Sequence, residues 1–442
     1  MRIVRLTEET RKDLLSTLLK RSPSQYGEYE QTVAQIVERI RTEGDSALFD
    51  LTEQFDHIRL DESTVTVTEQ EIREAYEEVD PKLLEVIRRA LVNIRSYHEK
   101  QRRYSWFDPS DNGILLGQKI TPLQRVGVYV PGGKAVYPSS VLMNVVPAKV
   151  AGVQQIVMTT PCRGGKVSPN TLVAAHEAGV DVIYKVGGAQ AIAALAHGTR
   201  TIPKVDKIVG PGNIFVALAK KAVYGFVGID SIAGPSEITV LADESANPRF
   251  VAADLLSQAE HDELASAILV TTSEELARRV SEEVDGFLKT LSRADIIRKS
   301  LDNYGYILLV DSLAEGIRTV DAIAPEHLEI VTVNPFDTMT RVHNAGAMFL
   351  GSWSSEPLGD YFAGPNHILP TNGTARFFSP LSVDDFVKKS SIVYYSQEAL
   401  RAVHDDIETF AKAEELTAHA NSVAVRFENE QEGEGNGTDS GS

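Results

Sequence analysis

The chain has 442 residues, of which 43% are hydrophobic and 24% charged, and its formal net charge at pH 7 is -18. This length exceeds what a single hydrophobic core usually organises, so two or more domains are expected. The excess of acidic residues argues against a general affinity for nucleic acid. No run of 18 apolar residues occurs, so no membrane-spanning helix is expected.

Residues 1–20 lack the long apolar core and the cleavage site of a signal peptide, so we expect a cytoplasmic protein. The single cysteine, Cys162, can form neither an internal disulfide nor a thiolate metal site by itself. Any metal must therefore be bound by nitrogen and oxygen ligands. We interpret Cys162 as a loop residue without a chemical role.

The first 105 residues or so are mainly helical by pattern. Apolar side chains recur at three- and four-residue spacing in residues 29–56 and 81–101, which indicates amphipathic helices. The alternating residues 58–72 between them fit a short strand. Nothing in this region indicates chemistry.

Strands and helices alternate from residue 124 onward, which implies parallel βαβ units. We therefore predict two doubly wound α/β units in tandem. The strands of the first unit are expected at 124–130, 154–160, 181–186 and 205–209, and those of the second at 237–243, 266–272, 304–310, 327–332 and 347–351.

The sequence becomes irregular after Trp353. Residues 355–382 are rich in glycine, proline and asparagine, and long irregular segments inside a compact protein are commonly functional. Their aromatic residues favour an ordered segment. A short helical region is predicted over residues 397–423, and the acidic residues 428–442 are expected to be disordered.

Four of the ten histidines lie among unusual neighbours. The other six sit in polar or helical segments without partners, and we interpret them as structural or surface residues. The four candidates are His261, His327, His367 and His419, and the six others are His57, His98, His176, His197, His343 and His404.

Gln258 and His261 lie three residues apart at the end of a predicted helix, which places both side chains on one helical face. A helix end reaching solvent would explain the pair without a metal. Asp360 lies between glycines that would fix a turn, and His419 lies near the end of the last helix. Imidazole and carboxylate groups suit Zn²⁺, but whether these side chains meet is left open.

Glu326 and His327 are adjacent, after a predicted helix and at the start of the next strand. A carboxylate beside an imidazole provides two bases with different pKa values. Neighbouring residues of an extended segment point in opposite directions, so a shared task requires a bend, and Pro325 restricts the backbone just before them. A polar turn without a chemical role is the alternative interpretation.

Three glycine-rich segments, 130–140, 186–191 and 209–215, each connect a predicted strand to a helix. Such loops lie at the carboxyl ends of the strands, where doubly wound sheets bind nucleotides and helix N-termini favour phosphate. None has the G-x-G-x-x-G spacing, and no acidic residue occupies the ribose-reading position. The pattern predicts a nucleotide or phosphate ligand.

Taken together, these segments resemble the histidinol dehydrogenase family. The matching motifs run in order from Tyr129 to Val423, and with the helical amino-terminal region they cover nearly all of the chain except its acidic tail. So many long motifs in register argue against a chance match. They include VGVYVPGGKAVYPSSVLMNVVPAKVAGV, VGGAQAIAAL, VDKIVGPGNIFVALAKK, AGPSEITVLAD, DLLSQAEHD, APEHLEI, PLGDYFAGPNHILPT, LSVDDFVKKSS and EELTAHANSV.

The resemblance implies oxidation of L-histidinol to L-histidine through histidinal, with two NAD⁺ and one zinc ion per active site. By motif, the general bases would be Glu326 and His327. His327 would take the alcohol proton, and Glu326 would activate water for attack on the aldehyde. The implied zinc ligands are Gln258, His261, Asp360 and His419, with His419 supplied by the other subunit of a homodimer.

The remaining site residues also follow from the resemblance. Tyr129, Gln190 and Asn213 match positions that contact NAD. On the substrate side, Ser236, His367 and Glu414 match, with Glu414 donated across the dimer interface. The zinc ligands and His327 also contact the substrate, so the implied substrate-binding set is Ser236, Gln258, His261, His327, Asp360, His367, Glu414 and His419.

The family fold implies two incomplete Rossmann-like domains and two smaller segments in a domain-swapped homodimer. We expect a helical amino-terminal region that packs partly with the second α/β domain. The expected divisions are 1–123 for that region, 124–235 for the NAD-binding domain, 236–352 for the domain with zinc and the bases, 353–427 for the active-site loop and swapped segment, and 428–442 for the tail.

Two other functions remain open at this point. A relative with the same fold could oxidise another small polyol, although the presence of Glu414 and His367 favours histidinol. A non-catalytic nucleotide-binding protein could also keep the fold. The presence of both candidate bases and all four candidate ligands weighs against that second alternative.

Overall fold

The computed structural model describes residues 1–19, 27–132 and 137–428. The chain divides into two compact units, the first made of residues 1–102 and 122–387 and the second of residues 103–121 and 388–442. Apart from its first residue, the tail that was expected to be disordered lies outside the described residues.

The first unit contains a five-stranded parallel sheet with the order β6-β5-β4-β7-β8. In chain order the strands are therefore arranged third, second, first, fourth and fifth, and the direction of winding reverses between β4 and β7. The predicted alternation in this region is confirmed. The strands are β4 (Arg125–Tyr129), β5 (Gln155–Thr159), β6 (Val182–Tyr184), β7 (Lys207–Val209) and β8 (Gly228–Ile229).

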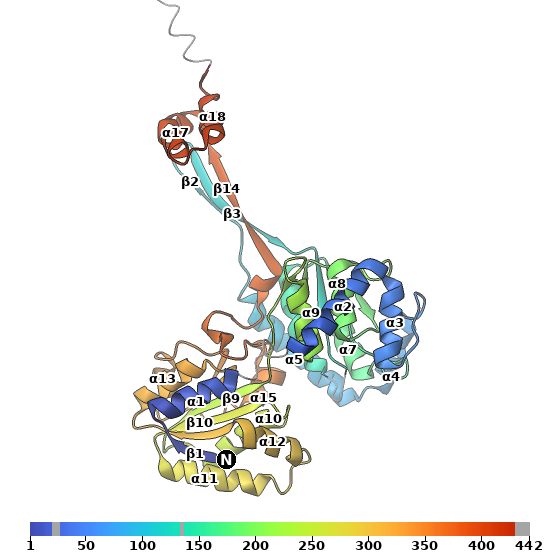
Figure 1. The fold of residues 1–442 in the computed structure, drawn as a ribbon, viewed down its shortest axis with the longest axis vertical. Helices are drawn as coiled ribbons and strands as arrows, with labels where there is room; N and C mark the ends of the chain where they lie inside the picture. Colours follow the sequence, from blue (N-terminus) through green and yellow to red (C-terminus); the bar gives the residue numbers. More distant parts are fainter. Residues whose placement is uncertain (20–26, 133–136, 429–442) are drawn as a thin grey trace, which may run out of the picture. The chain divides into compact units, whose positions relative to one another are not determined.

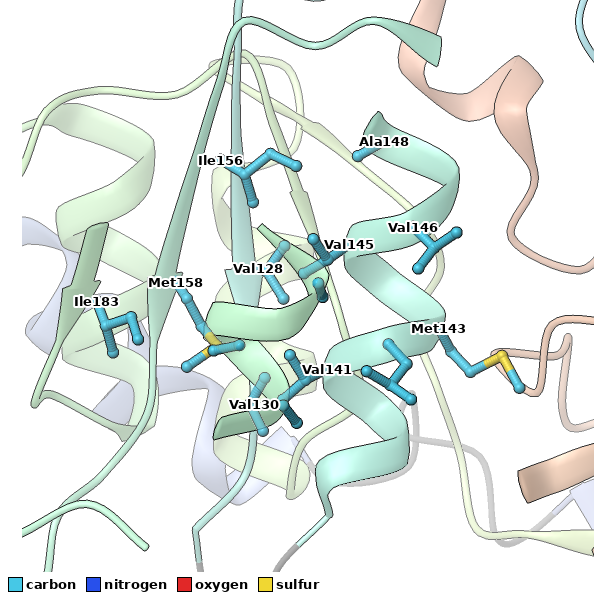
Figure 2. Packing of buried hydrophobic residues seen from close by; sticks show 14 of the residues in the cluster. Val128, Val130, Val141, Met143, Val145, Val146, Ala148, Ile156, Met158 and Ile183 are labelled. Carbon is cyan, nitrogen blue, oxygen red and sulfur yellow. The ribbon is translucent and has the colours of Figure 1, made fainter. Parts of the chain in front are cut away.

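Helices cover both faces of this sheet, and each face has its own buried apolar cluster. Figure 2 shows Val141 and Val145 of one helix beside Val128 and Met158 of the strands. On that face lie α4 (Glu69–Glu78), α5 (Pro81–Glu99), α6 (Pro138–Ala151) and α7 (Pro169–Ala178), and on the other lie α2 (Gly27–Glu43), α3 (Asp45–Asp56), α8 (Gly188–His197) and α9 (Ile214–Val223).

The short strand expected over residues 58–72 is wrong. Only an isolated antiparallel bridge forms there, between Thr66 and Tyr184. Thr68 ends the extended stretch because its side chain accepts a hydrogen bond from the Glu71 N–H, and the Glu71 carboxylate accepts one from the Thr68 N–H. This capping box starts α4 where a strand would have continued.

A second, six-stranded parallel sheet in the first unit has the order β1-β11-β10-β9-β12-β13. Its first strand comes from the amino-terminal region, where the sequence pattern indicated mainly helices. The strands are β1 (Arg2–Arg5), β9 (Glu237–Ala242), β10 (Ser266–Thr271), β11 (Gly305–Leu309), β12 (His327–Val331) and β13 (Ala347–Leu350).

Helices also cover both faces of the second sheet (Figure 1). Without β1, the strand order repeats that of the first sheet, with the winding reversed between β9 and β12. One face carries α10 (Pro248–Ala259), α11 (Glu274–Phe287) and α12 (Ala294–Tyr304), and the other carries α1 (Glu8–Leu19) and α13 (Leu313–Ile323), while α14 (Pro335–Met339) contacts β12 and β13.

The irregular segment after Trp353 is ordered, as expected from its aromatic residues. A short helix, α15 (Glu356–Leu358), continues into a π-helical turn, η2 (Gly359–Ala363), that carries Asp360. Single π-helical turns are rare and frequently occur at functional sites. Two 3₁₀ turns, η3 (Thr374–Arg376) and η4 (Val383–Phe386), follow, and Phe386 anchors the segment because its side chain is fully buried in a core cluster.

The second unit contains a three-stranded sheet with the order β14-β3-β2, in which β2 (Trp106–Pro109) and β3 (Ile114–Pro122) are antiparallel. Its third strand is β14 (Val387–Tyr395). The helical region predicted over residues 397–423 is confirmed as α16 (Gln397–Arg401), α17 (His404–Ala413) and α18 (Thr417–Ala424). Among the described residues, no helix combines the length and apolarity needed to cross a membrane.

Candidate active site

Glu326 and His327 lie at the amino-terminal end of β12, where the chain bends sharply. Ala324, the residue after α13, adopts the left-handed conformation, with φ 50°, and Pro325 follows. The bend directs both side chains to the same place, so that His327 Nδ1 lies 3.6 Å from Glu326 Oε2. The backbone bend that Glu326 and His327 need in order to act at one place is therefore present.

Both side chains are buried and anchored on the first residue of β9. The Glu237 N–H donates to Glu326 Oε2 at 2.8 Å, and His327 Nδ1 donates to the Glu237 carbonyl at 3.0 Å. The hydrogen bond to a carbonyl requires the proton on Nδ1. In the neutral ring the remaining acceptor is His327 Nε2, which is buried and has no hydrogen-bond partner in the structure.

Asp360 and His367 reach the same place from the irregular segment. His327 Nε2 lies 3.8 Å from Asp360 Oδ1. His367 Nδ1 donates to the Asp360 carbonyl at 3.1 Å and lies 3.9 Å from its carboxylate. Burial lowers the pKa of His367, which favours a neutral imidazole. The structure thus groups Glu326, His327, Asp360 and His367.

Glu356 also belongs to this group, although its sequence pattern did not single it out. Its Oε1 lies 3.9 Å from His327 Nε2, and the Ser257 hydroxyl lies 3.1 Å from its Oε2. The Glu356 N–H donates to the buried carboxylate of Glu329 at 2.9 Å. One ligand atom each from His327, Glu356 and Asp360 fits within 4.8 Å of the others, a spacing that could hold a metal ion.

Burial and crowding shift the pKa values in this group. Burial raises the pKa of Glu326 to about 8 and also raises that of Glu356. Burial lowers the pKa of His327, but the charges of Glu326, Asp360 and Glu356 outweigh this and raise it to about 10. Several buried carboxylates facing one imidazole favour a cation, because unpaired buried charge is costly.

Gln258 and His261 lie at the end of α10. The helix begins as the sequence suggests, since the Asn247 side chain accepts from the Arg249 N–H and Pro248 occupies the first turn. Gln258 is 1% exposed, and its Oε1 is buried without a hydrogen-bond partner. Such an oxygen is available to a ligand.

His261 lies in the turn that follows α10, and its N–H donates to the Gln258 carbonyl at 3.2 Å. The ring keeps solvent contact, yet the surrounding protein lowers its pKa, while the charge of Asp360 acts in the opposite direction. His261 therefore lies within the electrostatic field of Asp360. Ser236 directly precedes β9, on the same sheet edge as His327.

A cavity of about 590 Å³ opens beside this group. This volume falls within the range of small-molecule sites. Glu326, Gln258 and His261 are not among its lining residues. Its lining includes His327, Asp360, His367, Phe349, Tyr97 and Gln101.

The three residues expected to contact NAD gather at the carboxyl edge of the first sheet. Tyr129 ends β4, Gln190 lies in the first turn of α8, and Asn213 caps α9 by accepting from the Val216 N–H. The Gly188 N–H donates to the Tyr129 hydroxyl at 3.2 Å. Tyr129 and Gln190 are buried, Asn213 is exposed, and residues 133–136 of the neighbouring glycine-rich loop lie outside the described residues.

Glu414 and His419 belong to the second unit. Glu414 follows α17, His419 lies in α18, and both are exposed. Their grouping with Gln258, His261 and Asp360 stays a prediction.

The second unit also brings His404, Asp405 and Glu408 close together. His404 Nδ1 donates to the Arg401 carbonyl at 2.8 Å, and Glu408 pairs with Lys412 at 2.8 Å. The group is therefore stabilised without an ion, which agrees with the interpretation of His404 as a structural or surface residue.

Parallel sheets with glycine-rich turns at a winding reversal, and a buried carboxylate–imidazole pair near a cavity, define an α/β enzyme for a small molecule. The family model of histidinol dehydrogenase matches residues 19–427. The chain belongs to the histidinol dehydrogenase family.

Similar proteins share this family. A histidinol dehydrogenase from Clostridium acetobutylicum is 58% identical over 412 residues, covering 93% of this chain and 95% of the relative. One from Caldanaerobacter subterraneus subsp. tengcongensis is 57% identical over 424 residues, covering 96% and 98%. The crystal structure of histidinol dehydrogenase from Elizabethkingia anophelis superposes with a TM-score of 0.92 at 37% identity, covering 98% of this chain and 99% of that one.

Proposed function

We propose that this chain oxidises L-histidinol to L-histidine through histidinal, in two successive hydride transfers to NAD⁺. This reaction is the activity of its family, and the chain is accordingly an NAD-dependent oxidoreductase of histidine biosynthesis. The observation that carries the residue assignment is the convergence of Glu326, His327 and Asp360 at one buried place.

His327 is the base of the first step in this proposal. The surrounding carboxylates raise the pKa of His327 to about 10, so the ring can act as a base only when a bound cation offsets their charge. With the Nδ1 proton of that neutral ring donated to the Glu237 carbonyl, only Nε2 can accept the proton of the substrate alcohol. As the hydroxyl group loses this proton, the carbon that bears it transfers a hydride to NAD⁺, which gives the aldehyde. The Nε2 atom faces Asp360 in the cavity lining, so substrate and base would meet there.

Glu326 is the base of the second step. Its raised pKa of about 8 makes the carboxylate a stronger base than an ordinary glutamate near neutral pH. It would take a proton from water as the water attacks the aldehyde, while protonated His327 returns its proton to the aldehyde oxygen. The resulting hydrate would lose the second hydride to NAD⁺ and a hydroxyl proton to His327, which gives the carboxylic acid. The Glu237 N–H fixes the carboxylate and stabilises its ionised form.

The donor set fits a metal ion such as zinc. Gln258, His261 and Asp360, with His419 of a second subunit, would hold it. The unpartnered Gln258 oxygen supports this set, whereas the side chains that the structure brings within ligand spacing are His327, Glu356 and Asp360, which share only Asp360 with it. A bound zinc ion would hold the imidazole and amine nitrogens of the substrate. Ser236, His367 and Glu414 would complete the substrate site.

The cofactor site lies on the first sheet in this proposal. The strand order third-second-first-fourth-fifth is that of a Rossmann-like fold without its sixth strand. Tyr129, Gln190 and Asn213 cluster at the winding reversal, where such sheets bind nucleotides. Both sheets follow the same order, which supports two incomplete Rossmann-like domains within the expected division at 124–235 and 236–352.

We also propose a domain-swapped homodimer that assembles the site from two chains. The second unit exposes large apolar side chains on its sheet and helices, and contiguous exposed apolar surface commonly marks an interface. The exposed apolar residues include Trp106, Phe107, Leu116, Val393, Tyr394, Ile407 and Phe410.

Substrate competition tests this function. Purified enzyme with zinc and NAD⁺ is expected to oxidise L-histidinol with a higher kcat/KM than any small polyol that lacks an imidazole. A higher kcat/KM for such a polyol would instead assign the chain to another alcohol.

A further inference from the structure

Lys220 and Asp230 form a buried ion pair beneath the turn between β7 and α9. Their side chains are 3% and 5% exposed, and the ammonium and carboxylate groups are in direct contact. Neither residue has a place in the chemistry proposed above. Because buried charges are costly unless paired and hydrogen-bonded, the pair is unlike the exposed ion pairs elsewhere on the chain.

The pair holds both backbone groups of one residue, Gly210. Lys220 Nζ donates to the Gly210 carbonyl at 3.0 Å, and the Gly210 N–H donates to Asp230 Oδ2 at 2.8 Å. The Ser231 N–H donates to the other carboxylate oxygen at 2.7 Å. The two charged groups therefore fix the orientation of the peptide bonds on both sides of Gly210.

Gly210 itself is pressed against the end of β4. Its φ of +117° is unfavourable for residues with a side chain, and a Cβ atom would lie 2.1 Å from the Tyr129 carbonyl oxygen. Gly210 leads within three residues to Asn213, which caps α9. We call the Lys220–Asp230 ion pair, with its two hydrogen bonds to Gly210, the clamp. The clamp sets the position of Asn213 relative to Tyr129 at the point where the winding of the sheet reverses.

We propose that Lys220 and Asp230 are positioning residues for the dinucleotide, which hold the 210–213 turn in the shape that NAD⁺ binds. This inference rests on the cofactor site proposed above. The pair acts through the turn and touches no ligand itself. Its loss would let the Gly210 peptides rotate, and small displacements of positioning groups commonly cost on the order of 100-fold.

Steady-state kinetics of the full-length enzyme test the clamp. Lys220→Met is expected to raise KM for NAD⁺ by about 10- to 100-fold, with KM for L-histidinol and zinc content unchanged. Lys221→Met is the matched control, because Lys221 is the next residue of α9 and forms an exposed ion pair with Glu30 at 2.8 Å. It should leave KM for NAD⁺ unchanged.

A double variant separates positioning from stability. Lys220→Met alone leaves the Asp230 carboxylate buried without its partner and could unfold the protein. Lys220→Met combined with Asp230→Asn removes both charges, so its melting temperature should approach that of the unmodified enzyme while KM for NAD⁺ stays raised. A normal KM for NAD⁺ in the stable double variant would overturn the inference.

Asn213→Ala distinguishes the clamp from the site on which it depends. If Asn213→Ala raises KM for NAD⁺ and the double variant does not, the cofactor site stands and the clamp is overturned. If Asn213→Ala leaves KM for NAD⁺ unchanged, the proposed cofactor site is wrong and the clamp has nothing to position. Raised values for both variants support both proposals.

Discussion

The Nε2 atom of His327 lies 3.8 Å from the Oδ1 atom of Asp360. One of these residues starts a strand of the second sheet, and the other lies in a π-helical turn 33 residues later in the chain. The contact brings a candidate base next to a candidate metal ligand. It makes the amino-terminal edge of β12 the centre of the proposed chemistry.

Replacement of His327 tests its role as the base. His327→Asn keeps a donor for the Glu237 carbonyl but cannot accept the alcohol proton, so kcat should fall by about 10²- to 10⁴-fold. KM for NAD⁺ should not change. His343→Asn is a suitable control, because His343 is exposed and bonded to Asp321. A His327→Asn enzyme with near-normal kcat would remove His327 from the mechanism.

Metal analysis tests the ligand assignment. His261→Asn should weaken zinc binding by more than the roughly 10- to 100-fold typical of an outer-shell partner. The fold should survive, because His261 lies beyond the end of α10 and keeps solvent contact. Zinc is measured by atomic emission after dialysis against a weak chelator, with Glu260→Gln as control. Equal zinc content in both variants would contradict the assignment.

The stability of the protein in acid depends in part on the ion pair between Glu71 and Lys185. Burial raises the pKa of Glu71, but the 2.6 Å hydrogen bond from Lys185 and that from the Thr68 N–H outweigh it, so the folded pKa lies below the ordinary 4.5. The stabilisation is therefore present above pH 4.5 and is lost as pH falls through the folded pKa.

Glu71→Gln should accordingly reduce the free energy of unfolding at pH 7 by about 1 kcal/mol. Denaturant titrations at several pH values measure it, and the difference from the unmodified protein should shrink below about pH 4. Glu69→Gln is the control, since the Glu69 side chain is 93% exposed. A Glu71→Gln difference that persists undiminished at pH 3 would refute the electrostatic origin.

Mixed subunits test whether the site is shared between chains. His327→Ala and His419→Ala enzymes should each be inactive alone. Subunit exchange should restore part of the activity, because one site of a mixed dimer can be assembled from intact residues of both chains. Exchange is verified by differently tagged subunits, and no recovery after verified exchange would argue against a shared site.

The two sheets could be predicted because their strands are buried on both faces and appear as apolar runs between amphipathic helices. The four-residue β1 is too short to show a period. The strand β14 was missed for a different reason. Its residues are mostly exposed and include Lys388 and Lys389, so no buried face imposes an alternation.

The site was predicted less completely than the sheets. Glu326, His327 and Asp360 stood out through their neighbours, but the bend at Ala324 that joins the first two is a backbone feature with no strong sequence signal. The rule that ligands bind at the carboxyl ends of strands suits Tyr129, whereas His327 lies at the amino end of its strand.

The sequence around Glu356 contains a pattern from which its place in the site could have been predicted. It lies four residues before Asp360, about one helical turn, and Glu329 is an acid within the otherwise apolar strand HLEIV. A carboxyl group in a strand buried on both faces needs partners. Burial and the neighbouring Asp254 carboxyl raise the pKa of Glu329, and the Glu356 N–H donates to Glu329, which fixes the start of the segment leading to Asp360.

The stoichiometry of the complete reaction tests the central claim most directly. A limiting amount of L-histidinol is incubated with the enzyme, zinc and excess NAD⁺, and NADH is followed by its absorbance until the reaction stops. Two NADH per L-histidinol, with L-histidine as the only product, is the predicted result. One NADH per L-histidinol with release of the aldehyde, or no turnover at all, would contradict it.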